Sequence, residues 1–325
     1  MIYVCAQPST FYYAWQVDAM LLSFSKCGVN LGEVHIVSND VKDEHFLQVD
    51  KKWSKYAVKF SYYPDTRKDV KYISSIRPHL LEKHWKQNPH LADNFIFYHD
   101  CDIALSKPIP NLISKIKSNE CYLSDTISYI GAKYIESKGH YLLEDMCRIV
   151  TIEPGEVKAN ENRSGGAQYL LQPGIKATFW ARVYKDSENL FSKISARCRE
   201  IKKENPDWHE LQIWCADMWA VLWNLWKNGY ETICDKDLDF TWATNRMDKW
   251  SHNAIYHNAG VTKQVEGEPF YKGKYMKKSP LEAPRPDEKW ASQKYYDLVV
   301  EAWNDTKNGE QKQIIKKKQI IKKRV

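Results

Sequence analysis

The sequence predicts an α/β fold with a Rossmann-like, mostly parallel central sheet flanked by helices. Apolar segments of strand length lie at residues 2–6, 34–37 and 95–98. Between them, residues 13–26 and 73–85 show the apolar spacing of helices. This alternation of strand and helix is typical of doubly wound sheets, and 325 residues suffice for one large domain or two small ones.

The second half of the chain is expected to continue the same architecture. Strands are predicted at 163–171 and 254–256, and helices at 179–203, 210–226 and 289–303. The helix at 210–226 is apolar nearly all round except for Asp217 and Asn224, so most of its surface must be buried. A buried carboxylate needs a partner, and we expect one for Asp217.

The net charge of +7 comes from the C-terminus. Residues 311–325 carry seven basic residues and no acidic one, and without them the chain has 41 basic and 41 acidic residues. A neutral body argues against a basic nucleic-acid-binding domain. The tail is predicted to be a solvated, disordered extension that could contact an anionic partner.

No targeting or membrane segment is expected. The N-terminus lacks a basic region and a cleavage-site pattern, and no apolar run approaches about 18 residues. Eight cysteines without a Cys-x-x-Cys pair indicate reduced core residues. These features predict a cytoplasmic protein without a membrane span, located in the host cytoplasm if it is viral or from a phage.

Three Asp-x-Asp pairs occur, and their contexts differ. Asp100 and Asp102 follow a clear apolar strand, whereas the pairs among Asp235, Asp237 and Asp239 lie in a charge-rich loop. Two carboxylates at a strand end can hold Mn²⁺ or Mg²⁺ and leave coordination positions for phosphate oxygens. The sequence therefore favours Asp100 and Asp102 as metal ligands, with a solvated turn as the alternative.

A second pattern, His-x-x-Gly-x-x-Lys, follows a predicted strand at His257, Gly260 and Lys263. An imidazole can complete a carboxylate-rich Mn²⁺ site, glycine lets the backbone approach a phosphate, and lysine places a point charge on it. The alternative is a turn with a structural histidine. Together with the aspartates, the pattern predicts a metal-bound diphosphate.

These motifs resemble those of glycogenin-type retaining glycosyltransferases of the GT-A fold. A closer resemblance is to the hydroxyproline O-arabinosyltransferase and peptidyl-serine α-galactosyltransferase group. It is carried by Tyr12-Tyr-Ala-Trp15-Gln16, Ser23 to Gly28, Arg77-Pro78, Gly165-Gly166, Phe179-Trp180 and Asp217-Met218-Trp219. That group usually has Asp-Pro-Asp where this chain has Asp100-Cys101-Asp102. It also usually has Glu where this chain has Asp217.

The resemblance implies a metal-dependent and retaining transfer of a pentose or hexose from a UDP-sugar to a hydroxyl group on a protein or glycan. It also implies a single GT-A domain with two halves. Residues 1–110 form the nucleotide-sugar-binding half, 111–285 form the acceptor and catalytic half, 286–308 form a C-terminal helix, and 309–325 form the basic tail.

Site roles follow from this chemistry, in which charge develops on the leaving phosphate and on the anomeric carbon. Asp217, or the side-chain carbonyl of Gln168, could face the anomeric carbon; the alternatives are a core carboxylate paired with Arg or Trp, and plain packing. By fold analogy three polar residues face the nucleoside. The full set is Asp100, Asp102 and His257 for the metal, Arg77, Gly260 and Lys263 for the phosphates, and Gln7, Ser9 and Asn39 for the nucleoside.

Two other functions remain open on the sequence alone. The acceptor could be a hydroxymethylated base in viral or phage DNA, with the basic tail on the phosphate backbone. Alternatively, the chain could bind a nucleotide sugar or carbohydrate without turnover, which would be favoured if the aspartates bind no metal.

Overall fold

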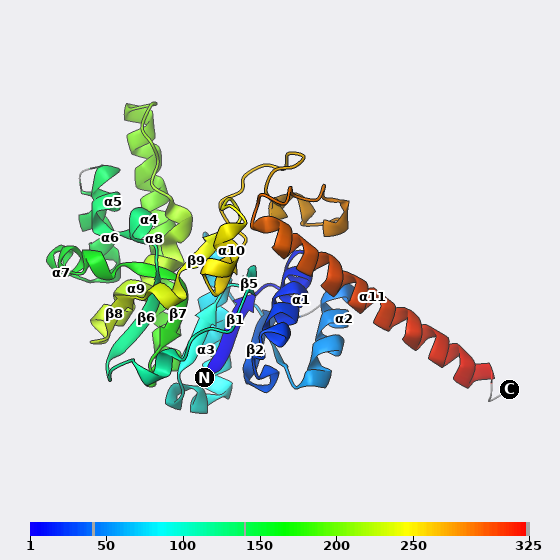
Figure 1. The fold of residues 1–325 in the computed structure, drawn as a ribbon. Coiled ribbons are helices and arrows are strands. Elements are labelled where there is room, and N and C mark those ends of the chain that lie inside the picture. The colour runs from blue at the N-terminus through cyan, green and yellow to red at the C-terminus, as the bar shows by residue number, and fades with distance from the viewer. Residues whose placement is uncertain (41–42, 140, 323–325) are drawn as a thin grey trace. The chain divides into compact units, whose positions relative to one another are not determined.

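The computed structural model describes residues 1–40, 43–139 and 141–322. Its central sheet has seven strands in the order β3-β2-β1-β4-β7-β6-β8, which confirms the predicted α/β class (Figure 1). β1 runs parallel to β4 and β6 parallel to β8, while β7 is antiparallel to both of its neighbours. A second sheet has the order β5-β10-β9.

The strands are short and mostly buried. Their bounds are β1 Ile2–Gln7, β2 Val34–Asn39, β3 Lys59–Tyr63, β4 Ile96–His99, β5 Ile103–Leu105, β6 Glu120–Asp125, β7 Gly165–Leu171, β8 Glu231–Cys234, β9 Phe240–Trp242 and β10 Ile255–His257. The strands predicted from the sequence correspond to β1, β2, β4, β7 and β10. Continuous apolar runs made them recognisable, because strands buried on both faces do not alternate.

The helices range from one turn to eight turns. Their bounds are α1 Phe11–Lys26, α2 Glu44–Trp53, α3 Ile76–Gln87, α4 Ile127–Ile130, α5 Ala132–Ser137, α6 Leu142–Val150, α7 Pro154–Ala159, α8 Ala177–Glu204, α9 Ala216–Lys227, α10 Asp248–His252 and α11 Ser292–Lys322. Among these helices, none combines the length and the apolar character needed to cross a membrane.

Two compact units divide the chain, and neither is continuous in sequence. The first contains residues 1–7, 63–100 and 111–239, and the second contains residues 8–62, 101–110 and 240–325. The sequence-based division near residue 110 instead assumed two consecutive halves. The chain passes from the first unit to the second between Asp100 and Cys101, inside the first Asp-x-Asp pair.

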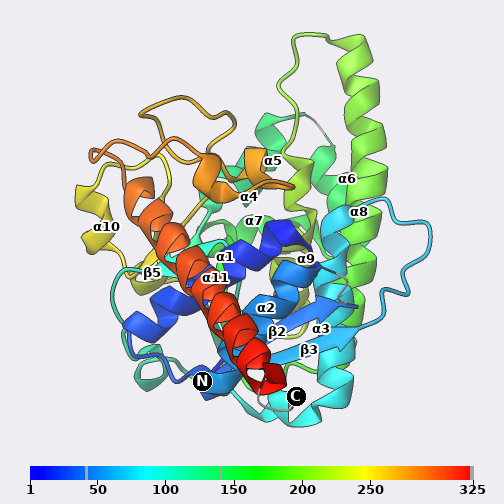
Figure 2. The same ribbon diagram turned by 90° about the vertical axis from the view of Figure 1, so that its right-hand side faces the viewer.

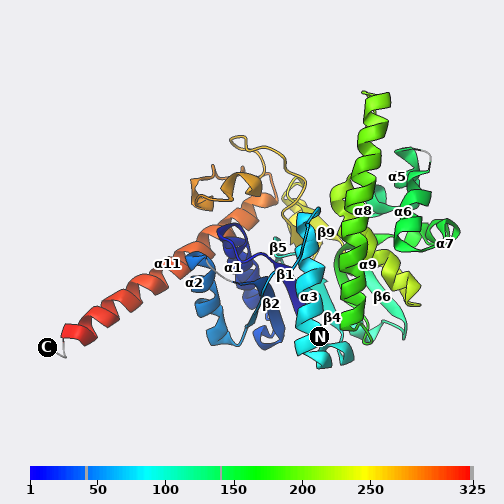
Figure 3. The ribbon, with the colours of Figure 1, turned by 180° about the vertical axis from the view of Figure 1, so that it is seen from behind.

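In the first unit, helices α3 and α8 lie side by side (Figure 3). Trp85 on α3 and Trp180 on α8 are fully buried with ring centroids 5.4 Å apart, and the Trp85 indole donates to the carbonyl of Ile175 over 2.8 Å. Trp219 and Trp223 on α9 are also fully buried. Much of the tryptophan excess is therefore core packing.

In the second unit, α1 packs against both α2 and α11 (Figure 2). Asp18 on α1 is 1% exposed and joins all three helices. It accepts hydrogen bonds from Lys52 (2.9 Å) and Trp53 (2.7 Å) on α2 and from Thr306 (2.6 Å) on α11. Buried charges persist when they are paired in this way.

Two helix predictions differ from the structure. The helix expected from residue 210 begins at Ala216, after a 3₁₀ turn at Ile213–Cys215. The last helix continues to Lys322, so the backbone of 309–322 is helical where the sequence suggested a disordered tail. Lys, Gln and Glu are strong helix formers, and they outweigh Gly309. Residues 323–325 lie outside the described residues.

Candidate functional site

In the second unit, strand pairing brings Asp102 beside His257. β5 begins directly after Asp102 and pairs antiparallel with β10, so that His257 lies opposite Ile103. The backbone N–H of Asn258 donates to the carbonyl of Asp102 over 2.9 Å. Nε2 of His257 lies 3.3 Å from Oδ1 of Asp102. Both side chains are buried, at 7% and 5% residue exposure.

A third group at this carboxylate, Lys272, was missed from the sequence. Its ammonium forms an ion pair with Oδ2 of Asp102. Burial opposes the charge on Asp102, but Lys272 and His257 outweigh it and hold the pKa of Asp102 well below its usual range. Lys272 lies between the predicted strand and the Pro-rich linker, where no periodic pattern marked it. Only the folded chain reveals this ion pair.

Gly260 and Lys263 lie in the loop after β10. Gly260 has a φ of 84°, which favours glycine, and a Cβ there would lie 3.4 Å from the ring of Trp242. Trp242 on β9 also stacks on His257, with ring centroids 6.3 Å apart and planes 7° from parallel. Lys263 is exposed and makes no hydrogen bond or ion pair with any described residue.

Ser9 and Asn39, both predicted to face a nucleoside, are brought together in the second unit. The backbone N–H of Ser9 donates to Oδ1 of Asn39 over 2.8 Å, and the Ser9 hydroxyl donates to the carbonyl of Asp40 over 3.0 Å. Asn39 is the last residue of β2. The structure therefore joins the turn after β1 to the carboxyl end of β2.

In the first unit, Arg77 on α3 bridges two carboxylates. One Nη group pairs with Asp100, directly after β4, and the other pairs with Asp217 in the first turn of α9. The Tyr72 hydroxyl lies 2.6 Å from both Oδ1 of Asp217 and the carbonyl of Trp214. Asp217 thus has the partner that its buried position demands, and the partner is itself a predicted site residue.

Burial and charge act together on this cluster. Burial opposes the charge on Arg77, but Asp100 and Asp217 raise the pKa of its guanidinium well above its usual value. Burial raises the pKa of Tyr72, and the negative charge of Asp217 raises it further. Arg77 therefore stays charged and Tyr72 stays neutral, so the phenol hydroxyl is a hydrogen-bond donor. The sequence offered no signal for Tyr72 beyond its place before a predicted helix.

Gln168 is fully buried on β7, opposite His99 of β4. Its Oε1 accepts a hydrogen bond from the Ser124 hydroxyl over 2.6 Å, a contact that the sequence did not predict. Gly165 begins the same strand, and a Cβ there would lie 2.5 Å from the carbonyl oxygen of Ser124, so only glycine fits at this position. Gln7 ends β1, which is parallel to β4, at the sheet edge that also carries Asp100.

The described residues include one group of side chains with the ligand types of a metal site: Asp100, Asp102 and His257. Asp100 belongs to the first unit and Asp102 to the second. Since a single residue separates them, covalent geometry keeps their Cα atoms within about 7 Å. Two carboxylates and one imidazole suit Mn²⁺ well, and Mg²⁺ when water supplies the remaining ligands.

The Asp-x-Asp pair at Asp235 and Asp237 has a different environment. Asp235 and Asp237 both pair with Lys115, at 2.9 Å and 2.7 Å. Oδ1 of Asp235 also accepts the backbone N–H of Asp237 over 2.9 Å and so caps a 3₁₀ turn. These carboxylates stabilise a loop, as their charge-rich context in the sequence indicated.

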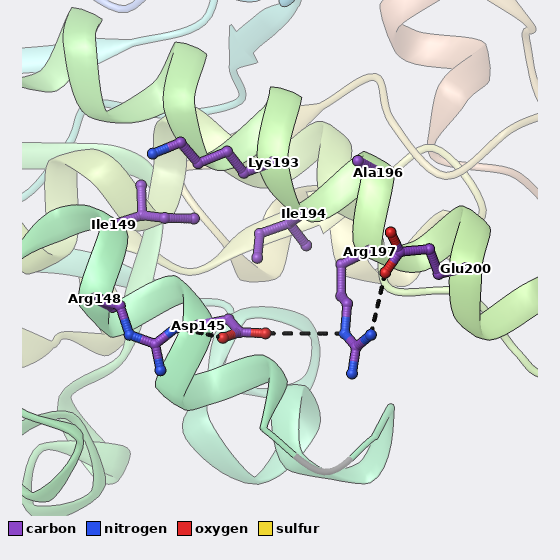
Figure 4. A pocket seen from close by; sticks show the side chains of 8 residues that line it. All are labelled: Asp145, Arg148, Ile149, Lys193, Ile194, Ala196, Arg197 and Glu200. Atoms are coloured by element: carbon purple, nitrogen blue, oxygen red, sulfur yellow. Dashed lines mark hydrogen bonds and ion pairs between the residues drawn. The ribbon is translucent and has the colours of Figure 1, made fainter.

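A pocket of about 350 Å³ lies elsewhere in the first unit, between α6 and α8 (Figure 4). Its charged lining residues pair with one another: Asp145 with Arg148 and Arg197, and Arg197 with Glu200. None of the side chains predicted for the site lines this pocket. It does not enter the chemistry that follows.

No family model and no curated protein matches the sequence. Solved structures of glycosyltransferases are similar to it. The galactosyltransferase LgtC, with donor and acceptor sugar analogs, matches at 13% identity over 93% of this chain and 96% of its own, with a TM-score of 0.44. Mouse xyloside xylosyltransferase 1 matches at 9% identity over 81% and 99%, with a TM-score of 0.37.

The bifunctional glycosyltransferase WbbM matches at 11% identity over 92% of this chain, with a TM-score of 0.49. This chain spans about half of WbbM, 51% of its length.

Proposed function

We propose that this protein is a metal-dependent glycosyltransferase of the GT-A class, which transfers a pentose or hexose from a UDP-sugar to a hydroxyl group of a protein or glycan and retains the anomeric configuration. The observation that carries the proposal is the contact between Asp102 and His257, 3.3 Å apart at adjoining strand ends, with Asp100 two residues earlier in the chain. The two sequence patterns thus meet at one place.

The donor set fits a divalent cation. Asp100, Asp102 and His257 would hold Mn²⁺ or Mg²⁺, and the bound ion would neutralise the charge that develops on the leaving diphosphate. The ammonium of Lys272 at Asp102 adds positive charge to the same place. Lys263, exposed after Gly260, can reach out to a phosphate oxygen.

Asp217 is the carboxylate that we propose to face the reacting sugar. Asp217 carries a negative charge next to Tyr72 and Arg77, and an anion at this position would stabilise positive charge on the anomeric carbon. Because both Nη groups of Arg77 already contact carboxylates, we assign Arg77 to positioning Asp100 and Asp217. Gln168, with its carbonyl bound to Ser124, would support the sheet beside Asp100.

Hydrolysis of the donor without an acceptor tests the proposal. A panel of nucleotide sugars is incubated with the protein and Mn²⁺, and release of the nucleoside diphosphate is measured. We expect slow release from one UDP-sugar, because water can replace the acceptor, and no release after chelation. Lack of turnover with every donor, or equal turnover with chelator present, would contradict the proposal.

Lys263 offers a second test within the same assay. Lys263→Ala should lower turnover by about tenfold and leave the thermal midpoint unchanged, because the exposed side chain makes no hydrogen bond or ion pair with any described residue. The matched control is Lys55→Ala, another exposed lysine in the second unit. A fall in the midpoint of Lys263→Ala without loss of turnover would assign Lys263 to folding.

A further inference from the structure

Trp214 differs from the other tryptophans of the chain. All 13 lie in the described part, and Trp214 alone among them is exposed, at 56%. Its indole stacks on the ring of Tyr129, with centroids 6.2 Å apart and planes 27° from parallel. Since Tyr129 is only partly exposed, it is the indole of Trp214 that presents an aromatic face to solvent.

The pair is tied to Asp217. Trp214 lies in the 3₁₀ turn Ile213–Cys215, directly before the helix α9 that carries Asp217. The Tyr72 hydroxyl lies 2.6 Å from the Trp214 carbonyl and 2.6 Å from Oδ1 of Asp217, so one buried phenol fixes both. Tyr72 itself stacks on Phe191 of α8, with centroids 4.8 Å apart. The backbone that carries Trp214 thus has a defined position relative to Asp217, and the ring of Tyr129 orients the indole.

Two aspartates lie near Tyr129, and one of them, Asp100, is paired with Arg77. Burial raises the pKa of Tyr129, and the negative charges of Asp100 and Asp125 raise it further. Asp125 is exposed at the end of β6. The exposed carboxylate of Asp125 would repel a phosphate group that approached Tyr129.

We propose that Trp214 and Tyr129 form the acceptor subsite, where the apolar face of a neutral pyranose ring stacks on the indole. The inference rests on the proposed function and narrows the acceptor to a sugar, that is, to a glycan rather than a bare peptide or a DNA base. A pyranose has one face of C–H groups that an aromatic ring can cover, and its hydroxyl groups remain free for polar partners.

Fluorine NMR on protein labelled with fluorotryptophan tests the subsite without any reaction. The resonance that disappears in Trp214→Phe belongs to Trp214. Methyl pyranosides of glucose, galactose, mannose and xylose are then added at millimolar concentrations. We expect at least one to shift this resonance and leave those of buried tryptophans such as Trp219 in place. Absence of any shift with all four, or a shift with single-stranded DNA alone, would overturn the proposal.

Kinetics complete the test and separate it from the proposed function. Trp214→Ala should raise the acceptor KM by about tenfold or more, Trp214→Phe should restore most of the affinity, and donor hydrolysis by both should equal that of wild type. Tyr56→Ala, which removes another exposed aromatic ring, is the matched control. Unchanged acceptor KM in Trp214→Ala would overturn the subsite, whereas absence of donor hydrolysis in the wild type would overturn the glycosyltransferase itself.

Discussion

Two Asp-x-Asp pairs of identical spacing occupy different environments in this protein. Asp100 pairs with Arg77, and Asp102 pairs with Lys272 and contacts His257. Asp235 and Asp237, in contrast, share one lysine, Lys115, whose side chain is 43% exposed.

Spacing alone therefore does not distinguish a candidate metal site from a loop. Asp102 is buried and has an imidazole within reach, so its desolvated charge can act on a bound ion and its phosphates. The pair at Asp235 and Asp237 lies near solvent, where ion pairs contribute little. Substitutions in the two pairs should therefore have unequal effects.

The largest difference is expected from isosteric substitutions in the two pairs. Asp102→Asn should lower kcat/KM for donor hydrolysis by about a hundredfold to a thousandfold, because it removes the buried charge that is proposed to bind the metal. Asp237→Asn should change it by less than about twofold. Circular dichroism of both variants verifies folding. Similar losses in the two variants would remove the distinction between the pairs.

Removal of metal should have the next largest effect. Titration calorimetry should show that a chelator weakens UDP binding by about tenfold or more, since diphosphate oxygens would share the cation with Asp100, Asp102 and His257. Asp235→Ala should show the same dependence on Mn²⁺ as the wild type. If the chelator leaves the affinity for UDP unchanged, a metal ion at Asp100 and Asp102 is excluded.

A smaller effect should follow from changing Arg77 or Lys115, the basic side chains that each pair with two aspartates. Arg77→Lys should lower kcat by about tenfold and the free energy of unfolding by about 2 kcal/mol, because one ammonium cannot hold both Asp100 and Asp217 as a planar guanidinium does. Lys115→Arg should leave both quantities unchanged. Urea unfolding and initial rates provide the measurements. Full activity of Arg77→Lys would show that the bridge does not position the site.

The smallest effect is expected at alkaline pH. Partial burial opposes the charge of Lys115, but Asp237 and Asp235 raise its pKa overall. A group with a raised pKa in the folded state stabilises the protein below its unfolded pKa, and this contribution is lost as the pH rises through the folded pKa. Above about pH 10, as the pH rises through the raised pKa of Lys115, the wild type should lose up to about 1 kcal/mol more of its free energy of unfolding than Lys115→Gln, after allowance for solvent screening.

Urea unfolding at several pH values measures this difference. Identical pH profiles for the two proteins would mean that the ion pairs at Lys115 contribute nothing to stability, and the second Asp-x-Asp pair would then act only through the cap that Asp235 forms.

The sequence by itself predicted the elements with strong local signals. Continuous apolar runs marked β1, β2 and β4, and helical spacing marked α1, α3 and α8. The alternation of these strands and helices then indicated the fold class. Strand β3 was not recognised, because only its last residue, Tyr63, is buried and its sequence carries no apolar run.

Only the tertiary structure decided which side chains meet. The pairing of β5 with β10 places His257 beside Asp102, although 154 residues separate them, and no local pattern encodes that register. The sequence did not predict the roles of Lys272, Tyr72 and Trp214 for the same reason. A single polar or aromatic residue forms no periodic pattern along the chain. The physical reason is that secondary structure depends on neighbours along the chain, whereas a site depends on strand register and helix packing, which arise from the burial of the whole core.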